Sequence, residues 1–260
     1  MAAPVCHVSA VKHITRRFLS CSVALQKTGL KKSKGNQSSN NWLQRQLNDP
    51  YVKSAQTEHF RCRSAFKLLE INDRFKIIRP GDTVIDCGAA PGSWSQVAAR
   101  AINKKDGNTM DGMKGSQTRQ NDRDGMVIGV DLQEVEPIEG VLMFSGHDFT
   151  SPDTQHKILN TLDNMYANVV LSDMAPSASG NKAFDHERIS KLCLSVLKFS
   201  SQVLANDGHV VCKLWDGSER KDLLKVMERM FRTVKVIKPD ASRSDSAEIF
   251  LLGMEFYLRK

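Results

Sequence analysis

The chain has 260 residues, of which 40% are hydrophobic and 25% are charged, and its formal net charge is +8. This length can bury a substantial core, and the apolar fraction is too high for a wholly disordered protein. No uncharged apolar run approaches the ~20 residues of a membrane-spanning helix, so we expect no membrane span. A pI near 9.2 favours nucleic-acid binding only if the positive charge belongs to the folded part.

The positive charge is concentrated at the N-terminus. Residues 1–48 carry no acidic side chain and eight basic ones, namely Lys12, Arg16, Arg17, Lys27, Lys31, Lys32, Lys34 and Arg45. Removing these eight leaves 29 basic residues against the 29 acidic residues of the remaining chain. Basic, hydroxylated and acid-poor segments are typical of organelle transit peptides. We therefore expect residues 1–41 to be an organelle transit peptide and flexible linker, which the family resemblance described below implies to be mitochondrial; the alternative is a basic arm that binds RNA directly.

The remainder, residues 42–260, alternates short apolar runs with amphipathic segments. The runs predict strands at 83–87, 126–131, 141–144, 167–173, 209–215, 234–238 and 248–256. Helices are predicted at 63–74, 93–103, 154–164, 185–205 and 218–231. This alternation predicts an α/β fold with a doubly wound, mainly parallel seven-stranded sheet. A short polar loop joins the last two strands, which predicts an antiparallel C-terminal hairpin at the sheet edge.

One segment interrupts the alternation. Residues 104–125 are rich in Gly, Asn and Asp, and Met is their only large apolar residue type. Such a composition cannot bury a core, so we expect a disordered surface insertion there. The six cysteines form no CxxC pair and the seven histidines show no HxxxH spacing, so we expect no metal site.

The strongest motif is Asp-Cys-Gly-Ala-Ala-Pro-Gly-Ser-Trp-Ser-Gln at residues 86–96, which follows the first strand and opens a helix. Small residues let the backbone turn tightly and approach a ligand closely. The spacing matches neither GxGxxG nor a P-loop, which argues against a nicotinamide oxidoreductase. The cofactor-binding residues that we expect in this loop are Gly88, Ala89, Pro91, Gly92, Ser93 and Trp94.

Acidic residues end the next two strands. Asp131, followed by Leu132, can accept the hydroxyls of a ribose, as in other doubly wound nucleotide-binding folds. Asp148, followed by Phe149, can receive an adenine amino group while the ring packs nearby. Acids at strand ends suit a neutral or cationic nucleoside, and S-adenosyl-L-methionine carries a sulfonium. The alternative is that each Asp only caps the helix that follows.

The motifs together resemble the FtsJ-like (heat-shock-type) 2′-O-ribose RNA methyltransferases. The matching segments span roughly residues 42–258 and are 64–68, 86–96, 171–176, 212–215, 238–239 and 246–248. Within that family the chain is most similar to the mitochondrial branch that modifies large-subunit ribosomal RNA. Ser93 departs from the more usual second glycine of the loop. The resemblance implies a Rossmann-like methyltransferase fold and S-adenosyl-L-methionine as cofactor.

The resemblance also implies a catalytic tetrad of Lys67, Asp173, Lys213 and Glu248. Lys213 would be the base, and Lys67 the nearby cation that lowers its pKa. Asp173 would orient Lys213 and face the methyl donor, while Glu248 would anchor the lysines. Taken singly, Lys67 and Glu248 can also be read as surface residues and Asp173 as a turn cap. Lys213 interrupts a buried apolar strand, where an unpaired lysine is costly.

Because residues 49–260 carry equal numbers of basic and acidic side chains, RNA must be bound through local basic patches. Candidate phosphate-binding residues are Arg61, Arg63, Lys238 and Arg243, although an ordinary charged surface explains them equally well. The resemblance implies methylation of a uridine in mitochondrial large-subunit rRNA, within an assembling ribosomal subunit in the matrix. We expect the enzyme to be a monomer. The alternative function is an RNA-binding assembly factor with a noncatalytic role.

Overall fold

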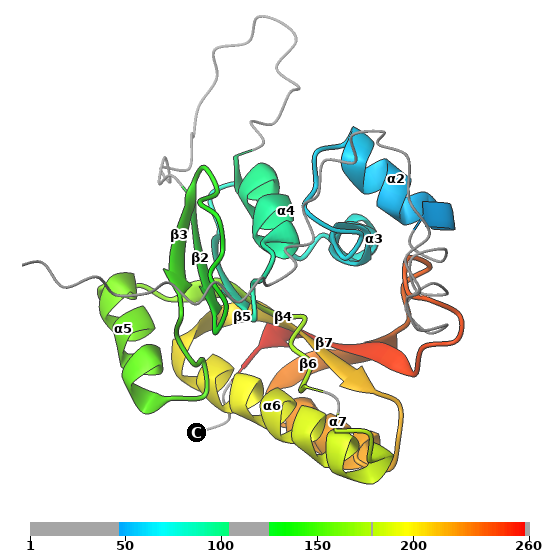
Figure 1. Cartoon of the computed structure of the whole chain (residues 1–260). Helices are drawn as coiled ribbons and strands as arrows, with labels where there is room; N and C mark the ends of the chain where they lie inside the picture. Colours follow the sequence, from blue (N-terminus) through cyan, green and yellow to red (C-terminus); the bar gives the residue numbers. More distant parts are fainter. Residues whose placement is uncertain (1–46, 104–124, 178, 258–260) are drawn as a thin grey trace, which may run out of the picture. The chain divides into compact units, whose positions relative to one another are not determined.

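The computed structural model describes residues 47–103, 125–177 and 179–257 (Figure 1). The expected transit peptide and linker (residues 1–41) and nearly all of the expected insertion (residues 104–125) therefore lie outside the described residues. In chain order the elements are α2 Pro50–Thr57, α3 Ala65–Phe75, β1 Thr83–Cys87, α4 Ser93–Ile102, β2 Met126–Asp131, β3 Val141–Ser145, α5 Pro152–Leu162, β4 Ala167–Ser172, α6 Lys182–Val203, β5 Leu204–Trp215, α7 Arg220–Glu228, β6 Phe231–Ile237 and β7 Glu248–Phe256.

The strands form one seven-stranded sheet in the order β3-β2-β1-β4-β5-β7-β6. The pairs from β3 through β5 are parallel, whereas β7 runs antiparallel to both β5 and β6. The predicted doubly wound sheet and antiparallel C-terminal pair are confirmed. The hairpin lies at the sheet edge as predicted, but its first strand, β6, forms that edge, because β7 with Glu248 lies between β5 and β6. Nearly all residues of β7 are buried, so it needs a neighbour on each side, and β6 with its exposed Lys235 and Val236 forms the edge.

Helices cover both faces of the sheet, with α2, α3 and α4 on one side and α5, α6 and α7 on the other (Figure 1). Successive side chains of a strand point to opposite faces. In β1, Val84 accordingly packs on the α2–α4 side, while Ile85 and Cys87 pack on the α5–α7 side. Within the described ranges, no helix is long and apolar enough to cross a membrane.

Two differences from the expected elements have local causes. Helix α2 was not expected from its apolar pattern, since Ala55 is its one buried residue; it starts from an Asp49 side chain that caps the Tyr51 amide and a proline in the first turn. Strand β5 begins at Leu204 rather than at 209, because the turn-like residues 206–208 are accommodated by a register shift against β4.

Candidate active site

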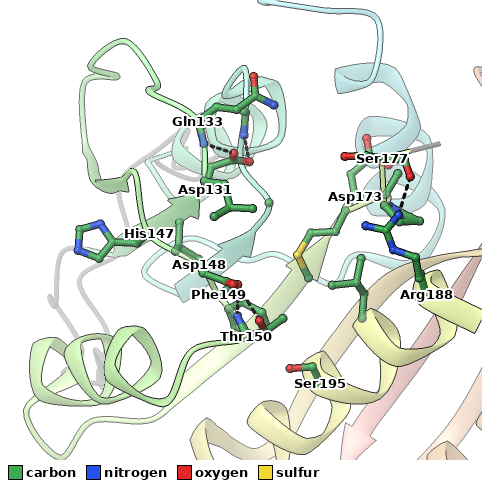
Figure 2. Close-up of a pocket in the computed structure, with 18 of the residues that line it drawn as sticks. Asp131, Gln133, His147, Asp148, Phe149, Thr150, Asp173, Ser177, Arg188 and Ser195 are labelled. Carbon is green, nitrogen blue, oxygen red and sulfur yellow. Dashed lines mark hydrogen bonds between the residues drawn. The ribbon is translucent and has the colours of Figure 1, made fainter. Parts of the chain in front are cut away.

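A cavity of about 620 Å³ opens at the carboxyl ends of the parallel strands, where doubly wound sheets bind ligands. Its walls come from the loops that follow β1, β2, β3 and β4 and from one side of α6 (Figure 2). Of the residues predicted to bind the cofactor, those that line it are Gly88, Asp131, Leu132, Asp148, Phe149 and Asp173.

Gly88 allows two of these loops to meet. Its φ is +79°, a backbone conformation that favours glycine. A Cβ at this position would lie 2.2 Å from Cγ of Met174 in the loop after β4. Two residues on, the Ala90 amide donates to Asp131 Oδ2 at 2.9 Å, which ties the loop after β1 to the end of β2. The small residues of the motif therefore bring three strand ends into contact.

Asp131 and Asp148 are each held in a tight turn at the cavity wall (Figure 2). Asp131 Oδ1 accepts the Gln133 amide at 2.7 Å. Asp148 Oδ1 accepts the backbone amide of Thr150 at 2.8 Å and its hydroxyl at 2.7 Å. Both acids thus stabilise local turns, but neither caps a helix as the alternative interpretation expected, because Ser151 is the N-cap of α5 and β2 is followed by a strand. A carboxylate oxygen can accept more than one hydrogen bond, so this role leaves capacity for a ligand.

Asp86 is fully buried near the end of β1, two residues before Gly88 of the cavity wall. Its Oδ2 accepts the Ser95 hydroxyl at 2.6 Å, and its Oδ1 has no hydrogen-bond partner within the described structure. Burial raises the pKa of Asp86 to about 7; the Ser95 hydrogen bond opposes this rise, and the charges of Asp173 and Asp131 add to it. The acids that line the cavity itself are Asp131, Asp148 and Asp173, and their carboxylates suit a cationic ligand.

Two apolar residues complete the nucleoside side of the cavity. Leu132 is 68% exposed at the cavity wall, where a planar ring could lie against it. Phe149 is almost fully buried and packs edge-on against Phe199, with the two ring centroids 5.3 Å apart. The acids and these apolar surfaces together fit a nucleoside that bears a positive charge.

The remaining predicted loop residues, Ala89, Pro91, Gly92, Ser93 and Trp94, do not line this cavity. Trp94 points into the core, where its ring lies 5.6 Å from that of Phe250. Its Nε1 donates to the Ser64 carbonyl at 2.8 Å. Trp94 thus anchors the loop after β1 to the core.

The sequence prediction missed the residues that α6 contributes, and of the loop after β4 it assigned a role only to Asp173. Arg188 and Lys191 line the cavity from α6, and Arg188 donates to the Ser177 carbonyl at 2.8 Å (Figure 2). His147, after β3, also lines the cavity. The position of α6 directly after the 171–176 motif was the one available signal, because helical periodicity does not indicate which polar face meets a ligand.

Asp173 forms the boundary between this cavity and a cluster of four ionisable side chains. Lys213 Nζ lies 2.9 Å from Asp173 Oδ1 and also donates to the Asp173 carbonyl. Lys67 Nζ lies 2.7 Å from Glu248 Oε1 and 4.0 Å from Asp173 Oδ1. The four side chains are only 10–17% exposed. The structure therefore brings together all four residues of the predicted tetrad.

The sheet explains how residues so distant in sequence converge. Alternation along β5 puts Lys213 on the same face as Val211, and alternation along β7 puts Glu248 on the same face as Phe250. Both core residues belong to the face that α2, α3 and α4 cover, and α3 supplies Lys67.

Two serine hydroxyls complete the contacts of the carboxylates. Ser242 Oγ donates to Glu248 Oε1 at 2.8 Å, and Ser64 Oγ donates to Asp173 Oδ2. Each acid of the tetrad therefore contacts at least one lysine and one hydroxyl. Two lysines and two carboxylates make the cluster formally neutral.

Arg61 and Lys238, two of the four predicted RNA-binding residues, are engaged by backbone carbonyls. Arg61 donates to the carbonyls of Pro91 and Glu136 at 2.8 Å and to that of Pro137 at 2.9 Å. Lys238 donates to the Ser246 carbonyl at 2.9 Å. Their hydrogen bonds hold loops of the protein itself.

Arg63 and Arg243 lie together at a second cavity, of about 1010 Å³. Arg63 pairs with Asp49 and donates to the Ala241 carbonyl, and its guanidinium lies 5.5 Å from the centre of the Tyr51 ring. Arg243 Nη2 is 3.8 Å from Asp49 Oδ2, and its side chain is one-third exposed. Of the four predicted residues, the structure gathers only these two at one cavity.

Strand order and site place the protein in a defined class. The sheet, the strand-end cavity and the adjoining lysine–carboxylate cluster define a Rossmann-like methyltransferase. Consistent with this, the fold is similar to that of a ribosomal RNA methyltransferase from Plasmodium falciparum, with a TM-score of 0.62 and 25% identity over 77% of this chain and 100% of that chain.

Sequence comparison gives the family. The model of the FtsJ-like methyltransferase family matches residues 60–256, and the chain belongs to that family. It is 46% identical over 219 residues to mitochondrial rRNA methyltransferase 2 of Drosophila melanogaster, covering 84% of this chain and 83% of that protein. It is also 44% identical over 217 residues to ribosomal RNA large subunit methyltransferase E of Rickettsia canadensis, with 84% and 88% covered.

Proposed function

We propose that this protein is an S-adenosyl-L-methionine-dependent methyltransferase that methylates the ribose 2′-hydroxyl of a uridine in mitochondrial large-subunit rRNA. The observation that carries the proposal is the convergence of Lys67, Asp173, Lys213 and Glu248 beside the strand-end cavity. Relatives that are themselves named rRNA methyltransferases, one of them mitochondrial, support the choice of substrate.

The cavity supplies groups for each part of the cofactor. Asp131 would accept the ribose hydroxyls, and Asp148 the adenine amino group, with Leu132 and Phe149 beside the ring. Backbone groups of Gly88 and Ala90 would shape the opposite wall, and Asp173 would face the methyl donor. When bound, the cofactor supplies a methyl group on a positively charged sulfur, which the surrounding acids would favour.

Lys213 performs the proton transfer in this mechanism. A ribose 2′-hydroxyl is a weak nucleophile, and Lys213 Nζ takes its proton as the oxygen attacks. Asp173 would orient this base, since Lys213 Nζ lies 2.9 Å from Asp173 Oδ1. Lys67 is the neighbouring cation, and its Nζ approaches the same oxygen at 4.0 Å. Glu248 holds Lys67 in place at 2.7 Å.

RNA phosphates would be bound at the second cavity, where Arg243 is the more accessible of two arginines. Arg63 would add positive charge without contacting a phosphate directly, because its guanidinium already pairs with Asp49. Arg61 and Lys238 would act chiefly by holding the loops that frame the site, because their side chains already donate to backbone carbonyls.

The N-terminal segment, residues 1–41, is the basis for the proposed location in the cell. Residues 1–41 would direct the protein to the mitochondrial matrix, and residues 42–260 would form the methyltransferase domain, with 104–125 as a surface insertion. The eight basic and no acidic side chains of residues 1–48 support this division. The enzyme would act as a monomer on rRNA within an assembling large subunit, and its modification would support ribosome assembly.

The test maps ribose methylation across mitochondrial rRNA in cells that lack this protein. We expect one uridine of the large-subunit rRNA to lose its 2′-O-methyl group, and we expect the wild-type protein, but not Lys213→Ala, to restore it. Loss of no ribosomal site would contradict the proposed activity. Full rescue of subunit assembly by Lys213→Ala would instead indicate the noncatalytic assembly role.

A further inference from the structure

Ser64 stands immediately before α3 and has an unusual set of contacts for that position. A serine at a helix N-cap normally accepts an amide hydrogen bond from the first turn. Ser64 has a helical backbone conformation, and its side chain makes no capping hydrogen bond. Its hydroxyl instead donates to Asp173 Oδ2, 109 residues further along the chain. The hydroxyl therefore acts on Asp173 rather than on α3.

The backbone of Ser64 has a separate role. Its carbonyl accepts Nε1 of Trp94 at 2.8 Å and the amide of Lys67 at 3.1 Å. These bonds join α3 to the helix that follows the cofactor loop, and they do not involve the side chain. A substitution that removes only the hydroxyl thus leaves them in place.

We propose that Ser64 is a positioning residue for methyl transfer, whose hydroxyl holds Asp173 Oδ2 and thereby orients Asp173 toward Lys213. This inference rests on the proposed function, since it assigns Ser64 a role in the activation of Lys213. The hydroxyl fixes one oxygen of Asp173, so the other oxygen, Oδ1, is presented to Lys213 at 2.9 Å.

Other charged groups contact the same pair without the help of Ser64. Lys67 Nζ lies 4.0 Å from Asp173 Oδ1, and Glu248 Oε1 contacts Lys67 at 2.7 Å. Neither contact involves the Ser64 hydroxyl, so removal of the hydroxyl tests its hold on Asp173 alone.

The experiment compares Ser64→Ala and Ser64→Thr with the wild-type chain, with kcat and KM measured on the large-subunit rRNA substrate. In Ser64→Ala we expect kcat to fall about tenfold, because Asp173 loses the hydrogen bond that fixes its position. The KM for S-adenosyl-L-methionine should stay within about twofold, because the Trp94 hydrogen bond is retained. Ser64→Thr, which keeps the hydroxyl, should restore the wild-type kcat.

A control is Ser200→Ala. Ser200 is fully buried, and its hydroxyl donates to the Val196 carbonyl inside α6. We expect kcat to stay at the wild-type value in this variant. Ser64→Cys, with a weaker donor, should give an intermediate loss of kcat, and it carries the test if Ser64→Ala does not fold.

Three results would overturn the inference while the wild-type enzyme is active. They are an unchanged kcat in both Ser64→Ala and Ser64→Cys, a lowered kcat that Ser64→Thr does not rescue, and an equal loss of kcat in Ser200→Ala. Absence of methyl transfer by the wild-type chain would instead overturn the proposed function, and this assignment with it.

Discussion

The acids of the cofactor cavity and the acids of the tetrad lie at one edge of one sheet, yet they are neutralised differently. Asp86, Asp131 and Asp148 accept hydrogen bonds from hydroxyls and backbone amides, and across the described ranges none of them forms an ion pair. Asp173 and Glu248 contact lysines at 2.9 and 2.7 Å. The first region keeps its negative charge for a cationic ligand, whereas the second is already balanced.

Charge balance suits the second region to proton transfer. When Lys213 gives up or accepts a proton, the cluster changes by one charge around neutrality and does not accumulate like charges. Asp173 belongs to both regions, since it lines the cavity and contacts both lysines. Its position couples the methyl donor on one side to the base on the other.

The largest effect should come from removing the base. We expect Lys213→Ala to lower kcat by about 10³-fold, because general-base catalysis contributes on the order of 10²–10⁴. Cofactor affinity should change little, since Lys213 does not line the cavity. Single-turnover methyl transfer measures the first quantity, and a cofactor titration measures the second.

The matched control for this variant is Lys198→Ala, which removes an exposed lysine of α6. It should retain wild-type activity. Parallel loss of cofactor binding in Lys213→Ala would show that the two regions are not separable, and activity near that of the wild type would remove Lys213 from the role of base.

The buried acid of the first region should be visible in stability. The pKa of Asp86 is raised from 3.8 to about 7, so between these values the folded chain keeps a proton that the unfolded chain has lost. This group therefore makes the folded state less stable as pH rises from 4 to 7 and has no further effect above that range. Asp86→Asn should remove this loss and gain about 2–4 kcal/mol over wild type by pH 8.

Chemical denaturation of both chains between pH 4 and 8 measures the difference in the free energy of unfolding. The gain of Asp86→Asn should be smallest at pH 4 and level off near pH 7. Ser95→Ala, which removes the hydrogen bond that lowers the pKa of Asp86, should extend the pH window upward. A difference independent of pH would show that Asp86 is ionised throughout.

The same two regions show what the sequence could and could not reveal. Lys213 was predictable, because a lysine inside a buried apolar strand needs a partner, and strand-end acids were predictable from the alternating pattern. The side-chain contacts of Arg61 and Trp94 were not, since they depend on partners 75 and 30 residues away in sequence. Local periodicity predicts which helix or strand carries a residue. Whether the hydrogen-bond donors of its side chain contact solvent or another loop depends on the tertiary packing.

The smallest effect tests the nucleoside wall of the cavity. Asp131→Ala removes a carboxylate that we expect to accept the ribose hydroxyls, and hydrogen bonds to charged groups contribute about 1.5–3 kcal/mol, so cofactor affinity should fall roughly 10- to 100-fold. At saturating cofactor, kcat should stay within about threefold of wild type, since no residue of the tetrad is changed.

Part of the loss of affinity in Asp131→Ala reflects the Ala90 and Gln133 amides, which lose their acceptor. Asp131→Asn keeps an oxygen for one of these amides and separates the two contributions, while Asp153→Ala, an exposed acid of α5, is the control. If Asp131→Asn binds the cofactor as tightly as wild type, the negative charge of Asp131 is not used, and the contrast between the two regions rests on Asp86 and Asp148 alone.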